Sequence, residues 1–346
     1  MSETADKKKN ITIMDVARQA GVSKMTVSRV LNNKELVKAS TRERIFDAMK
    51  ELNFRPNAMA RSLAGGQSLY VGLIYANPSY FYLSELLFGA MDACRDRGHH
   101  VLVDQAYNIS DLTDPAYIEQ RFFEMGVHAV IIAPPLSEVS EVVQNIEGAG
   151  INLVCIGTKP EGDRLCVRMD DLSASDDLIQ YLIDLGHQKI GIVEGPSDHK
   201  LASQLRRDGF QRTMDRNKLE VPANYVASGD FTMHSGMVAA RQLLATDPRP
   251  TAIFASNDDM AIGAINAAYE LGLRVPEDVS IVGFDDTQMA SSVWPPLTTV
   301  RQPIRDMASR AIDLLELKHH GEPIKSLSTT LEYELIVRAS SGPPKE

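Results

Sequence analysis

From residue 69 to residue 286, the chain alternates short apolar runs with stretches of helical length. The apolar runs are LYVGLIYA, HVLVD, HAVIIAPP, INLVCIG, KIGIVEG, TAIFASND and VSIVGFDD. Segments such as FYLSELLFGAMDACRDRG lie between them and have the length of a helix. Strand–helix alternation of this kind predicts parallel sheets covered by helices on both faces. We therefore expect an α/β body.

The overall length and composition narrow the class of protein. A chain of 346 residues is too long for one simple core, so we expect two or three compact units. No apolar run approaches the roughly 20 residues that a membrane helix needs, and no secretory signal is visible at the start. The cysteines Cys94, Cys155 and Cys166 are scattered, which fits a reducing cytoplasm and predicts no metal site.

The charge is distributed unevenly along the chain. Residues 1–66 carry 13 Lys and Arg against 7 Asp and Glu, while the remainder carries 23 against 39. A basic head on an acidic body favours a polyanionic partner for the head alone. A solvated lysine tail would explain the KKK run at 7–9 but not the rest of this excess.

The first 60 residues show the start and stop signals of short helices. Thr12 and Asp15 have capping-box spacing, Gly21 is suited to end a helix, and Ser23 is suited to cap the next one. This pattern predicts a helix-turn-helix. Ser40 and Glu43 suggest a third helix, and apolar residues recur on one face of each segment.

The second of these helices presents polar side chains on its outer face. If Val27, Val30 and Leu31 point into the core, the residues between them point outward: Lys24, Met25, Thr26, Ser28 and Arg29. The N-terminal end of such a helix enters the DNA major groove, where arginine pairs with guanine and methionine contacts the thymine methyl group. A three-helix bundle with a merely polar surface is the alternative, and the basic excess argues against it.

Three segments near the N-terminus resemble those of a known protein family. TIMDVARQAGVSKMTVSRVLNN, VKASTRERI and LNFRPNAMARSLAGGQS together resemble the DNA-binding head of the lactose-repressor/galactose-repressor family. The resemblance implies a helix-turn-helix head at 1–56 and a hinge helix with linker at 57–67. It also implies that Leu63 inserts into the minor groove and kinks the DNA. The expected DNA-binding residues are Thr12, Ser23, Lys24, Met25, Thr26, Ser28, Arg29, Asn32, Asn57, Ala60 and Leu63.

The same resemblance implies a body, residues 68–346, like a periplasmic sugar-binding protein with two doubly wound parallel-sheet subdomains. The N-subdomain would comprise 68–185 and 301–330, and the C-subdomain 186–300 and 331–346. Three segments would cross between them. The family also implies a homodimer, which suits two half-sites of a palindromic operator.

Residues after the strands are the candidates for binding a small effector, because open parallel sheets bind ligands beyond the carboxyl ends of their strands. Strand ends supply Tyr75, Asn77, Tyr80, Tyr82, Asp104, Asn257 and Asp285. Family positions add Ser173, Arg206, Phe231 and Gln302. Other roles remain open at this point, since Asn257 and Asp285 could cap helices, the tyrosines could be core or surface residues, and Arg206 could form an interface salt bridge.

A guanidinium, carboxylates, amides and an aromatic ring together suit a mono- or disaccharide. We therefore predict a bacterial cytoplasmic transcription regulator, associated with the nucleoid when bound to its operator. A purine or nucleoside corepressor is one alternative, since Phe231 could stack on a base. Control by a partner protein is another. A sugar-transport component agrees less well with the sequence, because such a protein would have no use for residues 12–64.

The sequence gives no indication of an enzyme. It contains no GxSxG, Walker or HExxH motif and no GxGxxG after a strand. We predict no catalytic residues, no metal site and no cofactor.

Overall fold

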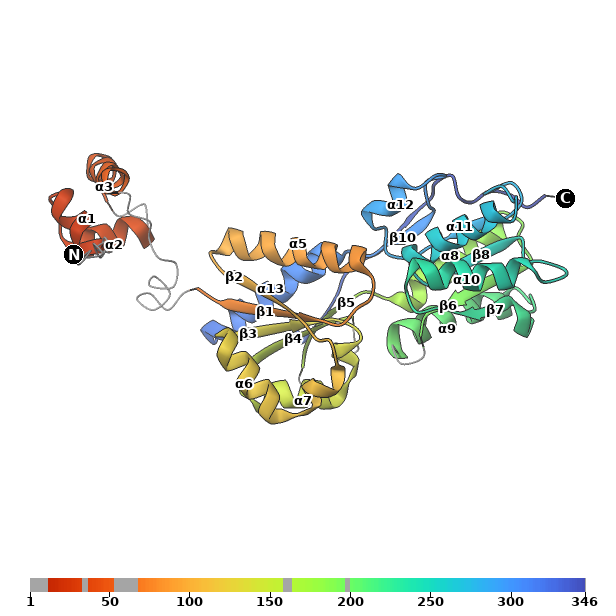
Figure 1. Cartoon of the computed structure of the whole chain (residues 1–346), viewed down its shortest axis with the longest axis horizontal. Helices are drawn as coiled ribbons and strands as arrows, with labels where there is room; N and C mark the ends of the chain where they lie inside the picture. The colour runs from red at the N-terminus through yellow and green to blue at the C-terminus, as the bar shows by residue number, and fades with distance from the viewer. Residues whose placement is uncertain (1–11, 33–36, 53–67, 158–163, 197–199, 346) are drawn as a thin grey trace, which may run out of the picture. The chain divides into compact units, whose positions relative to one another are not determined.

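The computed structural model describes residues 12–32, 37–52, 68–157, 164–196 and 200–345. The chain divides into two compact units, residues 1–68 and 69–346, and Figure 1 shows their elements. The predicted DNA-binding residues Asn57, Ala60 and Leu63 lie outside the described residues, as does the side chain of Asn32.

The described part of the head contains helices α1 (Ile13–Gln19), α2 (Lys24–Asn32) and α3 (Ala39–Glu51). Asp15 accepts hydrogen bonds from the backbone N–H and hydroxyl of Thr12 at 2.9 and 2.7 Å, which confirms the first predicted start signal. Gly21 has a φ of +64°, a conformation that favours glycine. The hydroxyl of Ser23 accepts from the backbone of Thr26, so it caps α2 as predicted.

The start of α3 differs from the expectation at Ser40. The helix begins at Ala39, its N-cap is Lys38, and no side chain caps it. Elsewhere the predicted core residues are buried together, including Val16, Ala17, Val27, Val30 and Ile45. The helical spacing thus identified the core even where the capping signal was misleading.

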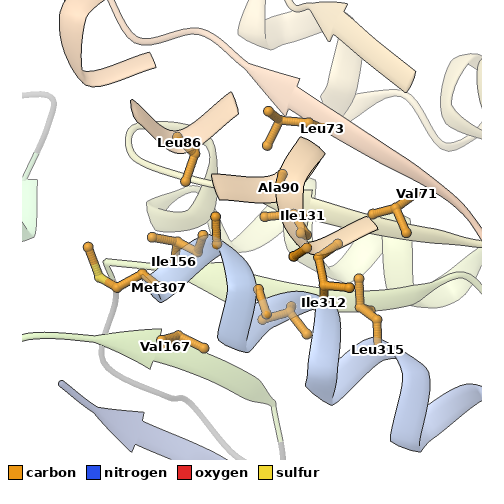
Figure 2. Close-up of a cluster of buried hydrophobic side chains, with 14 of the residues drawn as sticks. Val71, Leu73, Leu86, Ala90, Ile131, Ile156, Val167, Met307, Ile312 and Leu315 are labelled. Atoms are coloured by element: carbon orange, nitrogen blue, oxygen red, sulfur yellow. The ribbon is translucent and has the colours of Figure 1, made fainter. Parts of the chain in front are cut away.

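The N-subdomain of the body is built on a parallel sheet with strand order β11-β5-β4-β3-β1-β2 in the described residues. These strands are β1 (Tyr70–Tyr75), β2 (His100–Gln105), β3 (Ala129–Ile132), β4 (Asn152–Ile156), β5 (Leu165–Arg168) and β11 (Ser328–Thr330). Helices α5 (Tyr80–Arg97) and α13 (Ile304–His320) pack on one face. Figure 2 shows this core, where Leu86 and Ala90 of α5 and Ile312 of α13 meet strand residues such as Ile131. Helices α6 (Pro115–Met125) and α7 (Ser140–Gly148) cover the other face.

The C-subdomain repeats this arrangement with strand order β7-β6-β8-β9. Its strands are β6 (Ile190–Glu194), β7 (Val226–Ser228), β8 (Ala252–Ala255) and β9 (Ser280–Val282). Helices α8 (Asp171–Asp184) and α9 (Lys200–Arg216) cover one face, and α10 (Met233–Leu244) and α11 (Asp258–Glu270) cover the other. A short helix α12 (Gln288–Ser292) follows, and β10 (Thr299–Arg301) pairs antiparallel with β12 (Glu334–Ile336). Each of the seven apolar runs contains one of the described strands.

The boundary between the subdomains lies earlier than the expected residue 185. Ala174, Leu178 and Leu182 of α8 pack into the core of the second sheet beside Phe210 and Phe254. The whole helix therefore belongs to the C-subdomain. Within the described ranges, the chain crosses between subdomains near residues 169, 302 and 332. None of the described helices is long and apolar enough to span a membrane.

Candidate functional site

A small cavity lies between the two subdomains of the body, where the carboxyl ends of both sheets face each other. Its volume is about 40 Å³, room for only a few water molecules. Its lining comes from the loops after the strands and from α5, α8 and α9: Asn77, Ser79, Tyr82, Pro134, Gly157, Asp171, Ala202, Arg206, Phe231, Asn257, Asp285 and Gln302.

Arg206 is the central polar group of this cavity. Its Nε donates to Oδ1 of Asp171 at 3.0 Å, and one terminal nitrogen donates to the carbonyl of Ser256 at 2.5 Å. The same nitrogen lies 3.8 Å from Oδ1 of Asp285. The guanidinium also covers the ring of Phe284, 3.9 Å from its centre. These contacts fix a buried cation between two carboxylates.

The carboxylates of the cleft are unusually costly to ionise. Burial raises the pKa of Asp171 and, with less effect, Arg206 lowers it. Burial also raises the pKa of Asp285 well above its ordinary value, and that of Asp259. For Asp258, burial raises the pKa to about 7 despite hydrogen bonds from Thr299 and Thr287. A ligand whose hydroxyl groups donate hydrogen bonds to Asp171 or Asp285, the two carboxylates that line the cavity, would relieve part of that cost.

Phe231 is held in a strained backbone conformation at the cavity. Its φ is +66°, which is uncommon for a residue with a bulky side chain. The Nδ2 of Asn257 donates to the carbonyl of Phe231 at 3.0 Å, while Oδ1 of Asn257 caps α11 by accepting from Met260. Asp285 is also strained, with a φ of +130°. Such strain collects at functional sites, where the surroundings enforce it.

Two polar contacts join the subdomains at the rim of the cavity. The hydroxyl of Ser79 donates to Oδ2 of Asp259 at 2.5 Å. On the other side, Glu138 accepts from the backbone N–H groups of Leu201 and Ala202 at the start of α9. Both contacts hold the two subdomains together on either side of the cavity.

The structure gathers most of the predicted effector residues but not all of them. Those in the cavity lining are Asn77, Tyr82, Arg206, Phe231, Asn257, Asp285 and Gln302. The amide of Gln302 donates to Asp285 at 2.5 Å. Tyr82 is 8 % exposed, and burial raises the pKa of its phenol. The cap role left open for Asn257 also holds, and Asn257 combines it with a place in the cavity. The salt bridges of Arg206 lie within the C-subdomain and are not interface contacts.

Four predicted residues lie elsewhere. Asp104 is paired with Arg121 of α6, and Tyr75 donates to Gln105 on the neighbouring strand. Tyr80, in the first turn of α5, is 75 % exposed. Ser173 donates to Asp170 and lines a neighbouring hollow, which shares Gly157 and Asp171 with the cavity. Position after a strand or family position predicted these four residues, but none of them is part of the cavity lining.

Five cavity residues escaped the sequence analysis: Ser79, Pro134, Gly157, Asp171 and Ala202. Asp171 is the most important because it carries the ion pair with Arg206. It comes three residues after the end of β5 at Arg168, so the rule applied elsewhere would have found it if β5 had been recognised.

On the head, α2 presents an open polar face. Lys24 and Arg29 are exposed, and Met25 is 64 % exposed although its neighbour Val27 is fully buried. The hydroxyls of Ser23 and Thr26 lie 2.9 Å apart, and Ser28 is half-buried. Thr12 is exposed beside the start of α1. These residues form the candidate DNA-binding surface of the head.

Family models match both parts of the chain. Residues 12–57 match the model of bacterial regulatory proteins of the lacI family, and residues 179–341 match a periplasmic binding protein-like domain. The ribose operon repressor of Escherichia coli K12 is 36 % identical over 88 % of this chain and 92 % of its own. Catabolite control protein A of Priestia megaterium is 32 % identical over 96 % of this chain and 99 % of its own. The transcriptional repressor PurR of Vibrio cholerae is 33 % identical over 88 % of this chain and 90 % of its own.

Solved structures agree with these relatives. The lac repressor dimer bound to operator and the anti-inducer ONPF matches with a TM-score of 0.79 at 30 % identity, covering 96 % of this chain and all of the other. A lacI-family regulator from Enterococcus faecium with bound ribose matches with a TM-score of 0.68 at 26 % identity, covering 80 % and 100 %. The chain therefore belongs to the lacI family and is a DNA-binding transcriptional repressor with a ligand-binding body.

Proposed function

We propose that the body binds a neutral monosaccharide in the cavity around Arg206, and that this sugar controls the affinity of the repressor for its operator. The observation that carries the proposal is the buried Arg206 between Asp171 and Asp285. A planar guanidinium and a carboxylate can each bridge two neighbouring hydroxyl groups of a sugar. The amides of Asn77, Asn257 and Gln302 and the ring of Phe231 complete such a site.

The lining of the cavity favours a monosaccharide over the disaccharide that the sequence had left open. A volume of about 40 Å³ is already too small for one sugar ring, so the subdomains must separate slightly to admit it. Tyr75 and Tyr80, which could have extended the binding surface, are outside the cavity. The likeness to a ribose operon repressor and to a ribose-bound regulator supports a pentose.

The charges in the cavity favour a neutral ligand. Its lining carries the carboxylates Asp171 and Asp285 against the guanidinium of Arg206. A phosphate group would bring further negative charge into a buried site whose two carboxyl groups already resist ionisation and whose one cation is paired, so its binding is disfavoured. A neutral polyol instead donates to carboxylates and accepts from the guanidinium.

A purine is the second candidate. The ring of Phe231 could stack on a base, and the carboxylates and amides could bind its edge. The PurR relative supports this alternative. It would act as a corepressor, so its addition would strengthen operator binding, whereas an inducing sugar would weaken it.

For the head, we propose that Lys24, Met25 and Arg29 read bases in the major groove. Thr12, Ser23, Thr26, Ser28 and Asn32 would position the helix on the phosphates. Residues 57–67 would act as the hinge, with Asn57, Ala60 and Leu63 in the minor groove. If so, Leu63→Ala weakens operator binding and leaves effector binding intact. Equal operator affinity of this variant and the parent would contradict the hinge.

We also propose that the repressor is a homodimer in the bacterial cytoplasm, paired through one side of the body. Helix α5 carries the exposed apolar residues Tyr80, Phe88 and Met91, and Trp294 follows α12 with 79 % of its surface exposed. Figure 1 shows α5 and α12 on the same side of the body. A twofold dimer would present two α2 helices to successive major grooves of a palindromic operator.

A thermal-shift screen of the full chain tests the effector proposal. The panel comprises pentoses, hexoses, disaccharides, sugar phosphates and nucleobases, because binding to the native state raises the melting temperature. Each ligand that raises the melting temperature is then added to an operator-binding assay. A monosaccharide that shifts the parent but not Arg206→Ala, and that changes operator affinity, supports the proposal. A response to purines alone transfers it to the second candidate, and a response to neither overturns both.

A further inference from the structure

One end of the N-subdomain gathers histidines. Within the described residues, His99, His100, His128, His319 and His320 cluster there, five of the eight in the sequence. They come from the starts of β2 and β3 and from the last turn of α13. Because the strands are parallel, this is the edge of the sheet opposite the cavity. No group of described residues is arranged to hold a metal ion, so metal binding does not explain the cluster.

Two of these histidines hold the first backbone groups of the body. The backbone N–H of Leu69 donates to Nδ1 of His99 at 3.3 Å. The next N–H, that of Tyr70, donates to Nδ1 of His128 at 3.1 Å. An imidazole nitrogen accepts a hydrogen bond only when it carries no proton. Both rings must therefore be neutral, with the proton on Nε2, for β1 to begin as it does.

The surroundings of both rings oppose a positive charge. Burial lowers the pKa of His99 most strongly. Glu316, whose Oε1 lies 3.6 Å from Nε2 of His99, raises it, and Arg97 at the end of α5 and the two histidines of α13 lower it further. Arg97 is itself paired with Asp313 of α13. Burial and His319 likewise lower the pKa of His128.

Tyr70 connects the members of the cluster. Its ring stacks on the ring of His100, with the two ring centres 4.8 Å apart. The ring centre of His128 lies 5.7 Å from that of Tyr70 and 6.3 Å from that of His319. The backbone carbonyl of Tyr70 also accepts from the N–H of His128 at 2.8 Å. A change at either imidazole is therefore transmitted directly to the first residues of β1.

We propose that His99 and His128 form an acid-sensitive anchor for the start of β1, through which mild acid weakens operator binding. Protonation of Nδ1 places an N–H against the N–H of Leu69 or Tyr70, so the hydrogen bond is replaced by repulsion. Residues 57–67, which join the DNA-binding head to the body, lead directly into this point. Loss of the anchor releases the chain end from which the head is positioned.

The direction of the effect follows from the lowered pKa values. Above the ordinary histidine pKa of about 6.5, both rings are neutral and the anchor is complete. As the pH falls below about 6.5, the released state gains protons that the anchored state excludes, so anchoring weakens. The head contributes no histidine to this titration, because the first histidine in the sequence is His99.

The test compares operator affinity at about pH 7.5 and about pH 5.5, at constant salt, for the parent and the double variant His99→Asn/His128→Asn. The Oδ1 of asparagine can replace Nδ1 as an acceptor but does not titrate in this range. We expect the parent to lose about fivefold or more in affinity on acidification, and the double variant to lose less than about twofold. His234→Asn, at an exposed position of α10, is the matched control and should behave as the parent.

Equal losses in the parent and the double variant would overturn the proposal, as would no loss in the parent. Amide exchange of residues 69–75, corrected for intrinsic rates and measured without DNA, tests the anchor separately. Exchange should accelerate in acid in the parent only. If it does not, the anchor is refuted even when the double variant folds poorly. Failure of the parent to bind operator at either pH would count against the DNA-binding function, while the exchange result would still test the anchor.

Discussion

Nε of Arg206 and Oδ1 of Asp171 are 3.0 Å apart, and each side chain has only 7 % of its surface exposed. This buried pair joins α9 to the first residue of α8 at the wall of the cavity. Breaking a buried pair from one side leaves an uncompensated charge and costs more than the pair contributes.

We therefore predict that Arg206→Ala abolishes effector binding and lowers the unfolding free energy by about 3 kcal/mol. Calorimetric titration and denaturant unfolding measure the two effects. Arg207→Ala is the matched control on the same helix, because the Arg207 side chain is 58 % exposed and pairs with Glu194. Similar loss of effector binding in both variants would show that Arg206 has no special part in the site.

Gly195 follows β6 and lies against the ring of Phe231. A Cβ atom at this position would collide with Phe231 and with the hydroxyl of Ser203. We predict that Gly195→Ala displaces the ring and weakens effector binding by about tenfold or more, since one displaced contact of about 1.4 kcal/mol corresponds to a factor of ten. Gly148→Ala in α7, where nothing lies within 4 Å, should bind effector as the parent does. Unchanged binding by Gly195→Ala would mean that the position of the ring is unimportant.

Lys24 and Met25 should govern which operator is recognised without affecting the stability of the head. Both are exposed on α2. Replacing either by alanine should reduce discrimination among operator sequences by about 1–3 kcal/mol per lost base contact. Binding to a library of operator variants measures this. In contrast, Val27→Ala should destabilise the head by about 1–3 kcal/mol, because Val27 is fully buried. An unaltered base preference in both surface variants would refute the assignment.

The buried Asp258 should make the stability of the protein fall as the pH rises, whereas the histidine anchor weakens as the pH falls. Burial raises the pKa of Asp258 to about 7 in the folded protein, above the ordinary value of 3.8. Between these two values the folded state binds more protons than the unfolded state, so this residue's contribution to stability falls as the pH rises from about 4 to about 7.

Asparagine at position 258 cannot ionise, so the stability of Asp258→Asn relative to the parent should improve between about pH 5 and about pH 8. Denaturant unfolding at several pH values gives this difference. Asp111→Asn, at an exposed position of the short 3₁₀ helix Ile109–Thr113, is the matched control. If the difference in unfolding free energy between Asp258→Asn and the parent does not change with pH, Asp258 has the same protonation in the folded and the unfolded state.

The sequence by itself determined the parts of this protein that depend on local order. Helical spacing identified the core of the head, including Val16 and Val27, and apolar runs located most of the strands. Both signals arise because side chains repeat with the period of the backbone that carries them. The capping signal failed at Ser40, because α3 begins at Ala39 with Lys38 as its N-cap and no side chain caps it.

Only the tertiary structure decided which strand-end residues form the site. Asp104 and Asp285 both come near the ends of apolar runs, but Asp104 pairs with Arg121 of α6, whereas Asp285 faces Arg206 across the cavity. The sheet edge fixes where the chain emerges, and the packing of distant helices fixes where each side chain points. The anchor at His99 and His128 was equally hidden from the sequence. Leu69 and Tyr70 meet these rings only because the starts of parallel strands assemble at one edge.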